Sequence, residues 1–116
     1  YLERMRGRKV LIVGNHDAEL LADERSRRYF DEIQYYLEIK DSEKQIVLCH
    51  YPMAEWNGMN RGWRHVFAHI HAQTNSTYSI MRNLPKALNA GCMINNFAPA
   101  TLDELVVNNR IFNETH

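Results

Sequence analysis

The sequence predicts a single α/β domain, and three patterns lead to this fold class. Short, continuous apolar runs at residues 9–13 and 45–49 are typical of strands that are buried on both faces. Residues 33–39 alternate between apolar and other side chains, which is the period of a half-buried strand. Near the end of the chain, Thr101 and Glu104 form a Thr-x-x-Glu capping box before an apolar segment, which predicts a C-terminal helix.

The elements of the first half follow in a regular order. The run at 9–13 stops at Gly14-Asn15, a pair that is typical of a tight turn. Residues 18–30 carry few apolar side chains among many charged ones, so we expect a short exposed helix or a loop. A polar turn at 41–44 joins the strand before it to the run at 45–49, which predicts a β-hairpin.

The second half begins with a long loop. Residues 53–63 combine glycines and asparagines with both tryptophans of the chain, which indicates a loop with bulky anchors. Long loops in compact domains are often functional. We expect further strands at 65–68 and at 87–94, the second of which is interrupted at Gly91.

The composition is that of an ordinary globular protein. A length of 116 residues suits one domain, which we place at 1–116, and 45% of the residues are hydrophobic. Lys and Arg together number 14, as do Asp and Glu, so the net charge is zero. This balance lacks the basic excess of a dedicated nucleic-acid-binding protein.

The sequence also bears on where the protein works. Cys49 and Cys92 lie far apart in apolar runs, which argues against a disulfide framework or a Cys-x-x-Cys zinc site and favours a reducing cytoplasm. No apolar stretch approaches the ~20 residues of a membrane helix, and no signal peptide is recognisable. Residues 1–4 contain no initiator Met and shortly precede a strand, so we expect part of the domain to lie upstream.

Three histidine-bearing segments each follow directly after a strand-like run. They are Gly14-Asn15-His16-Asp17, Cys49-His50-Tyr51-Pro52 and Ala68-His69-Ile70-His71. Because ligand sites in α/β proteins lie outside the carboxyl ends of the strands, these imidazoles and the Asn15 amide can converge on one crevice. In an extended chain His69 and His71 would aim their rings to the same side. Imidazole suits Zn, Fe and Ni, and an amide oxygen suits harder ions such as Mn, so a mixed metal site follows.

Each of these segments also has a simpler interpretation when it is taken alone. A single histidine at a strand end is more often a hydrogen-bonded structural residue than a ligand, and we expect His65 and His116 to be of that kind. Gly-Asn-His-Asp alone can be a type I′ turn, since Asn and Gly tolerate positive φ. The three segments together, in this order and each after a strand, are more specific than any one of them.

Taken in this order, the three segments resemble the last three signature blocks of the calcineurin-like metallophosphoesterases. The resemblance extends to the Trp-bearing loop, to Asn89-Ala90-Gly91 and to the tail at 96–105, which look like those of compact bacterial and phage members. It runs over nearly the whole chain. It implies a hydrolase that acts on a phosphoester substrate and uses two metal ions.

The resemblance implies a set of metal ligands. Asn15, His50 and His69 would ligate the second ion of the pair, and His71 would ligate the first. The implied cofactors are divalent ions, namely Mn, Fe, Zn or Ni. Two such ions, about 3.5 to 4 Å apart, activate a water molecule and stabilise charge on the attacking and leaving oxygens of an in-line displacement.

The resemblance also implies catalytic residues. His16 would be the histidine that protonates or stabilises the leaving oxygen, with Asp17 orienting its ring. Arg61 or Arg64 could grip a phosphate of the substrate, because the guanidinium fork matches the phosphate oxygens.

The chain departs from the family pattern in one large respect. An Asp-x-His block and a Gly-Asp block should lie before Gly14, and the 13 residues there contain neither Asp nor His. The bridging carboxylate and two ligands of the first ion are therefore missing, so we expect at most one ion to bind, and weakly. Ala68 stands where a glycine usually precedes the first histidine of the last block, which adds a methyl group near the metal site.

The family fold is a four-layer α/β/β/α sandwich with mixed sheets, and this chain would be a partial version without the N-terminal strand–helix units. Such a version exposes a sheet edge, which favours pairing into a homodimer.

The sequence leaves two functions open for the chain. The chain is either part of a metal-dependent phosphomonoesterase or phosphodiesterase whose other ligands come from elsewhere, or a catalytically inactive relative that acts as a binding or interaction module.

Overall fold

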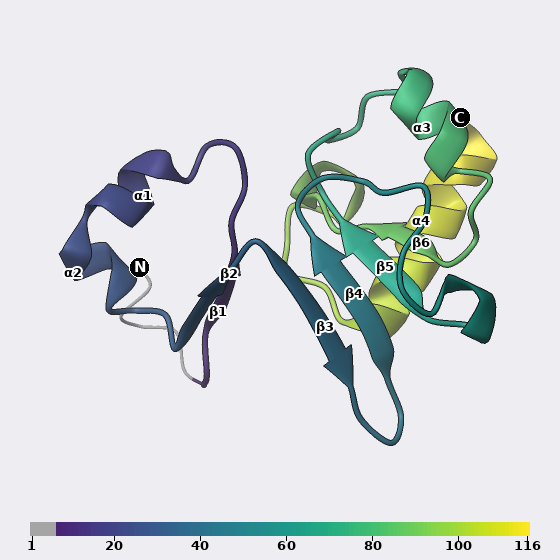
Figure 1. Ribbon diagram of the computed structural model, residues 1–116. Coiled ribbons are helices and arrows are strands. Elements are labelled where there is room, and N and C mark those ends of the chain that lie inside the picture. The colour runs from purple at the N-terminus through teal and green to yellow at the C-terminus, as the bar shows by residue number, and fades with distance from the viewer. Residues whose placement is uncertain (1–6) are drawn as a thin grey trace.

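Residues 7–116, which the computed structural model describes, form a mixed α/β fold that contains two sheets (Figure 1). The N-terminal part consists of β1 (Val10–Ile12), α1 (Ala18–Ala22), α2 (Glu24–Arg27) and β2 (Glu32–Gln34). β1 and β2 pair in parallel as a two-stranded sheet. The two short helices agree with the helical alternative expected for 18–30, whereas residues 1–4 lie outside the described part of the chain.

A four-stranded sheet organises the rest of the chain. Its strands lie in the order β3 (Tyr36–Lys40), β4 (Gln45–Cys49), β5 (Arg64–Phe67) and β6 (Ala87–Asn89). β3 and β4 are antiparallel, which confirms the predicted hairpin, whereas β4, β5 and β6 are parallel. The single strand predicted at 33–39 is in fact two strands, because the chain passes from one sheet to the other at Tyr35.

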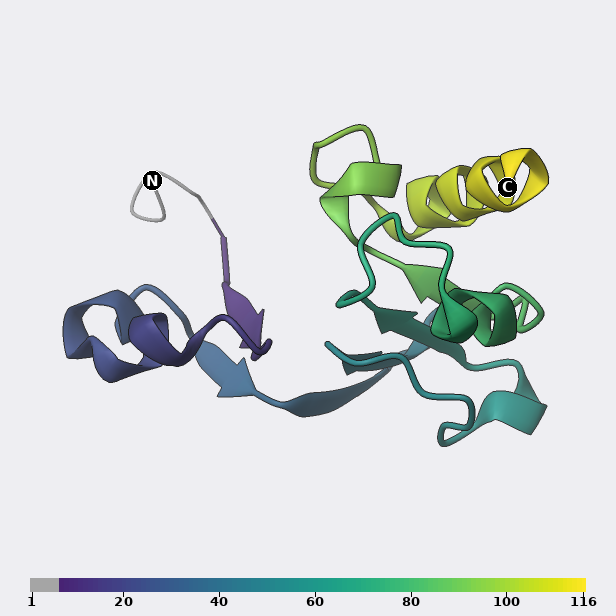
Figure 2. The same cartoon turned by 90° about the horizontal axis from the view of Figure 1, so that it is seen from above.

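The C-terminal helix begins where the sequence predicts it. α4 (Leu102–Thr115) starts at a complete capping box, in which the hydroxyl of Thr101 accepts from the backbone N–H of Glu104 at 3.3 Å. In return, the carboxylate of Glu104 accepts from the backbone N–H of Thr101 at 3.0 Å. Figure 2 shows α4 running beside β6, at one edge of the four-stranded sheet.

Other short elements differ from the sequence-based expectations. α3 (Ser76–Met81) is not predicted by any of the patterns above, and the side chain of Asn75 caps it by accepting from the N–H of Tyr78. The strand expected at 87–94 ends at Asn89, and its second half is a 3₁₀ helix, η3 (Cys92–Ile94). A further 3₁₀ helix, η2 (Met59–Arg61), lies in the Trp-bearing loop.

The hydrophobic core lies against one face of the four-stranded sheet. Its buried members are Val47, Trp56, Trp63, Phe67, Ile70, Tyr78, Met81 and Ala87. The indole N–H of Trp56 donates to the carbonyl of Trp63 at 2.9 Å, so the two predicted anchors hold each other and the loop between them. Gly58 has a φ of 78°, and a Cβ atom there would lie 2.2 Å from the Trp63 ring, so only glycine fits.

His65 and His116 are structural residues, as the sequence predicts. His65 is fully buried in β5, where its Nδ1 donates to the carbonyl of Val47 at 3.1 Å. Its Nε2 accepts from the backbone N–H of Met53 at 3.0 Å, so both ring nitrogens are paired. His116 stacks on Phe112 at the end of α4.

The structure corrects the expectation that β1 is buried on both faces. Val10 is 40% exposed, and Leu11 and Ile12 are partly exposed, because the two-stranded sheet is covered incompletely. Only Val13, just after the strand, is buried. No helix within residues 7–116 has the length and apolar character needed to span a bilayer.

Candidate metal centre

The loop after β1 meets the carboxyl ends of β4 and β5, and polar side chains from three distant segments gather there. The Nε2 atom of His50 lies 2.9 Å from the Oδ1 atom of Asn15. The rings of His50 and His69 are in edge contact, with their centroids 5.3 Å apart. The Nε2 atom of His16 lies 3.2 Å from the Nδ2 atom of Asn15. We name Asn15, His16, His50 and His69 the histidine cluster.

Hydrogen-bond polarity fixes which ring atoms carry a proton in the cluster. The Oδ1 atom of Asn15 can only accept, so the Nε2 atom of His50 donates in their bond. The Nδ2 atom of Asn15 can only donate, so the Nε2 atom of His16 accepts. The amide of Asn15 therefore links two imidazoles, and its oxygen faces a ring nitrogen of His50.

Gly14 lets the His50 ring approach the loop after β1. A Cβ atom on Gly14 would lie 2.8 Å from Nδ1 and 2.9 Å from Cε1 of His50, which is closer than non-bonded atoms approach. The backbone N–H of Gly14 also donates to the carboxylate of Asp17 at 2.6 Å, and this bond closes the turn. The glycine of the Gly-Asn-His-Asp segment thus keeps room for an imidazole from β4.

His69 lies in a strained turn after β5. Its φ is 61°, in the left-handed region that bulky residues rarely adopt. The N–H of Ile70 donates to the carbonyl of Ala68 at 2.7 Å, the pattern of a γ-turn centred on His69. The N–H of Ala68 donates to the carbonyl of His50 at 2.9 Å and ties this turn to the end of β4. Such strain clusters at functional sites, so it singles out the same segment as the histidine contacts do.

His71 lies beside the cluster. Its φ is 53°, so the expectation of an extended His-x-His segment is wrong, and the chain turns at both histidines. The carbonyl of His71 accepts from the Nδ2 atom of Asn89 at 2.9 Å. The His71 side chain is exposed and lines an open hollow of about 330 Å³ together with Gln73 and Met93.

Burial and neighbouring imidazoles lower the pKa of His50. Burial has the largest effect, and a charge on His69 lowers the pKa further, whereas the carboxylate of Asp17 acts in the opposite direction. Charges on His16 and His71 lower the pKa by smaller amounts. The other three histidines of the three segments, His16, His69 and His71, therefore all lie within electrostatic range of His50. A lowered pKa keeps the ring neutral, which is the form that binds a metal ion.

Asp17 does not contact the ring that it was expected to orient. Its carboxylate accepts from the backbone N–H of Gly14, while the ring of His16 pairs with the amide of Asn15. Asp17 therefore stabilises the turn in which His16 lies.

Arg61 and Arg64 are not brought to the histidine cluster. Arg64 begins β5, whereas the cluster lies beyond the opposite end of that strand. The guanidinium of Arg61 lies over the Trp63 ring, 6.0 Å from its centroid, and so belongs to the Trp-bearing loop.

The separation of two polar atoms in the cluster, Asn15 Oδ1 and His50 Nε2, is compatible with two ligands of one ion. Two ligands at about 2.1 Å from an ion and at a right angle are about 3 Å apart, which is close to the separation of Asn15 Oδ1 and His50 Nε2. No three His, Cys, Asp or Glu side chains within residues 7–116 form a metal-binding group, so an ion at this place would need the amide oxygen of Asn15 among its donors. A neutral set of this kind favours transition-metal ions over Mg²⁺.

Two residues of the site were not assigned from the sequence. The Tyr51 ring lies 5.1 Å from the His50 ring and 4.6 Å from the His69 ring, so it contacts both imidazoles. Asn89 is the last residue of β6, so it lies at the carboxyl end of a strand, like the histidine segments. Its amide donates a hydrogen bond to the carbonyl of His71. The rule about carboxyl ends of parallel strands, applied to this strand as well, could have found Asn89.

Comparisons with known proteins bear on the fold. No protein-family model matches the chain, and no curated protein matches it. A crystal structure of a protein of unknown function from Aquifex aeolicus is similar to it, with a TM-score of 0.63 and 25% sequence identity. The match covers 89% of this chain, which spans 62% of the length of that protein. The similarity supports a mixed α/β fold with two sheets.

Proposed function

We propose that this chain is the C-terminal portion of a calcineurin-like metallophosphoesterase, a metal-dependent phosphoester hydrolase. The observation that carries the proposal is the histidine cluster, in which Asn15, His50 and His69 meet from three strand ends. These are the residues that the resemblance implies as ligands of one ion. Their contact connects the N-terminal part, which contains Asn15, with the four-stranded sheet, at whose strand ends His50 and His69 lie.

The proposal includes a partial four-layer α/β/β/α sandwich. An open hollow of about 190 Å³ is lined by Ile12 of the two-stranded sheet and by Leu48 and Val66 of the four-stranded sheet. These apolar side chains line a space next to both sheets, which is where two sheets of a sandwich would face each other. The remaining strands, the bridging carboxylate and the other ligands would come from a segment outside these 116 residues or from another chain.

Asn15, His50 and His69 would hold one ion, for which Mn, Fe, Zn and Ni are candidates. When bound, the ion would supply an activated water molecule and neutralise charge on the phosphate. To become a ligand, the Nε2 atom of His50 has to give up the hydrogen that it donates to Asn15, by a shift of its tautomer. The lowered pKa of His50 favours the neutral ring that this shift requires.

In this proposal His16 would be the general acid. Its ring is exposed and contacts the amide of Asn15 at 3.2 Å, so it stays beside the ligand atoms while remaining open to a substrate. An imidazolium next to the leaving oxygen can donate a proton, a contribution of ~10²- to 10⁴-fold in rate.

Metal binding by the chain tests this proposal. Isothermal calorimetry with Mn²⁺, Zn²⁺ and Ni²⁺ should show weak binding at one site, and Mg²⁺ should bind hardly at all because the donors are neutral. His50→Ala should abolish the binding. His116→Ala removes an imidazole at the far end of α4 and should leave the binding unchanged. Equal binding by the natural protein and His50→Ala would exclude the cluster as the site.

A second candidate function is an interaction module without catalysis. β3 is an edge strand of the four-stranded sheet, and it exposes Tyr36 at 43% and Ile39 at 37%. Tyr35, just before it, is 69% exposed. Apolar side chains on an open strand edge favour pairing with another strand, so this candidate takes the form of a homodimer through β3.

Sedimentation velocity over a range of protein concentrations tests the homodimer. The natural protein should associate, and Ile39→Lys should remain a monomer because it adds a charge to the paired edge. Ile111→Lys is a matched control, since Ile111 is 52% exposed but lies on α4. A natural protein that stays monomeric, or a dimer that persists in Ile39→Lys, would contradict pairing through β3.

A further inference from the structure

We propose that Asn89 is a positioning residue that holds the turn of His69 and His71 in its left-handed conformation. The amide of Asn89 reaches from the end of β6 to the backbone of His71 in the neighbouring segment. The inference deepens the proposed function, on which its metal-binding test rests, whereas its structural test is independent of any metal.

Both polar ends of the Asn89 side chain are occupied. Its Nδ2 donates to the carbonyl of His71 at 2.9 Å, and its Oδ1 accepts from the backbone N–H of Gly91 at 2.8 Å. Asn89 is 5% exposed, so water does not compete freely for these bonds. One amide therefore joins the segment that follows β5 to the segment that follows β6.

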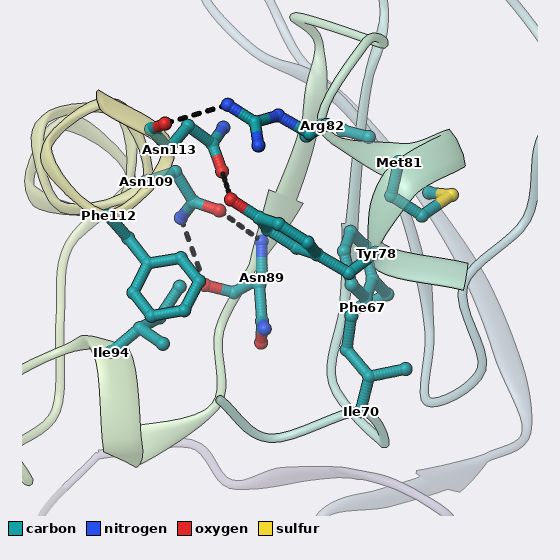
Figure 3. A pocket seen from close by; sticks show the side chains of 11 residues that line it. Phe67, Ile70, Tyr78, Met81, Arg82, Asn89, Ile94, Asn109, Phe112 and Asn113 are labelled. Carbon is teal, nitrogen blue, oxygen red and sulfur yellow. Dashed lines mark hydrogen bonds between the residues drawn. The ribbon is translucent and has the colours of Figure 1, made fainter. Parts of the chain in front are cut away.

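A frame of buried amides fixes the backbone of Asn89, and Figure 3 shows the part of it that Asn109 contributes. Its N–H donates to the Oδ1 atom of Asn109 at 2.8 Å, and its carbonyl accepts from Asn109 Nδ2 and Asn95 Nδ2, each at 3.0 Å. Asn109 thus pairs with the free edge of β6 as a strand residue would. No buried side-chain nitrogen or oxygen in the described part of the chain lacks a partner, so reorienting the Asn89 amide would break bonds already made.

The conformation that Asn89 holds needs such support. His71 is exposed, so the packing of its own side chain does not hold its φ at 53°. Left-handed backbone persists in a bulky residue only where the surrounding structure imposes it. Gly91 completes the contact, because a Cβ atom there would lie 3.0 Å from Asn89 Oδ1 and 3.9 Å from the Cα atom of His71. Asn89, Gly91 and the His71 backbone pack as one unit.

The test compares Asn89→Ala with Asn95→Ala. Both remove a buried amide of the same network, but the side-chain bonds of Asn95 go to Asn89, Gly91 and Asn108, not to His71. Both variants should lower the Tm. Only Asn89→Ala should change the φ-dependent NMR couplings of His69 and His71 and the ¹⁵N shifts of their rings. Its Ni²⁺ affinity should fall by ~10- to 100-fold, the usual effect of losing a residue that orients a ligand.

Gly91→Ala keeps the test decisive if Asn89→Ala fails to fold. The backbone of Gly91, at φ −59° and ψ 139°, accepts alanine, and the added methyl would press on the Asn89 amide. The NMR signals of His69 and His71 should therefore shift in this variant as well. Unchanged signals in Gly91→Ala and in a folded Asn89→Ala, or equal changes in Asn95→Ala, would overturn the inference. Shifted signals without any Ni²⁺ binding would support it and count against the proposed function.

Discussion

At the residue scale, the candidate site depends on backbone conformations that side chains normally avoid. His69 and His71 have φ values of 61° and 53° within a span of three residues. Such a conformation costs about 1–2 kcal/mol for a residue other than glycine. The turn places the His69 ring against the rings of His50 and Tyr51, so the strain accompanies the arrangement of the imidazoles.

The strain at His69 predicts an unusual preference for glycine. His69→Gly and His69→Ala both lose the ring, but only glycine relaxes the left-handed φ, so the Gly variant should be more stable by about 1 kcal/mol. Urea unfolding measures this difference. Ala72→Gly is the control, because Ala72 does not have a positive φ and glycine there should destabilise. Equal stability of the two His69 variants would mean that the turn is not strained.

At the element scale, sequence patterns predicted the helices and strands that are determined by interactions between residues close in the sequence. β4 spans Gln45–Cys49, the apolar run at 45–49, and α4 begins at its capping box. The break between β2 and β3 was not predictable, because alternation continues through Tyr35 while the hydrogen-bonding partner changes from β1 to β4. α3 has only two buried side chains in six residues, so its apolar pattern was too short to recognise.

The candidate site was predicted in its membership more than in its geometry. The segments of His50 and His69 could be found because the parallel strands β4 and β5 end at a common edge. Asn15 follows a strand of the other sheet, and the structure brings it to this edge through its contact with His50. The turn at His71 could not be found, because its partner Asn89 lies 18 residues away in the sequence. Local propensity carries no information about such a bond.

The buried His65 side chain holds the start of the loop at 53–63, through its hydrogen bond with the backbone N–H of Met53. Burial lowers the pKa of His65, although hydrogen bonding to the backbone of Val47 and Tyr51 acts in the opposite direction. An unfolded chain takes up a proton at His65 near pH 6.5, before the folded protein does. Stability should therefore be complete above that pH and fall as the pH drops from about 6.5 toward the lower pKa of the folded state.

This pH dependence can be measured by urea unfolding between pH 7.5 and pH 5. His65→Phe should reduce the loss of stability over this range, though not remove it, because the pKa of His50 is lowered too. At pH 7.5 the variant should be less stable by ~1–3 kcal/mol, because the backbone N–H of Met53 loses its acceptor, and the bond to the Val47 carbonyl is lost as well. His116→Ala should keep the natural pH dependence. An equally steep dependence in His65→Phe would rule out His65 as its source.

At the scale of the whole molecule, the described chain is more open than a domain of its length. Its radius of gyration is 14.7 Å, compared with about 13 Å for a compact domain of 100 residues. The N-terminal part and the four-stranded sheet are joined by the chain at Tyr35 and meet again where Asn15 contacts His50. The histidine cluster therefore takes donors from both parts, and any added layer that fixes the two parts relative to each other should also order the cluster.

The incomplete site of the open chain should limit its catalytic activity. The chain by itself should hydrolyse an aryl phosphate or an aryl phosphodiester only at background rate, because one ion cannot stabilise both the attacking and the leaving oxygen. Fusing a segment with an Asp-x-His block and a Gly-Asp block ahead of Gly14, or supplying it in trans, should create Mn²⁺-dependent hydrolysis. Strong activity of the 116 residues alone would contradict the ligand count.

In the completed protein, substitution of His16 should affect catalysis but not metal binding. Its ring contacts Asn15 only through the amide nitrogen, so His16→Ala should leave the oxygen of Asn15 free to bind the ion and the Mn²⁺ affinity nearly unchanged. Loss of the general acid should nevertheless lower kcat by ~10²- to 10⁴-fold. The deficit should shrink for substrates with better leaving groups, since these need less protonation, whereas His50→Ala should fail on all of them. If the completed protein binds both ions and remains inactive on several phosphoester classes, the interaction module becomes the better account.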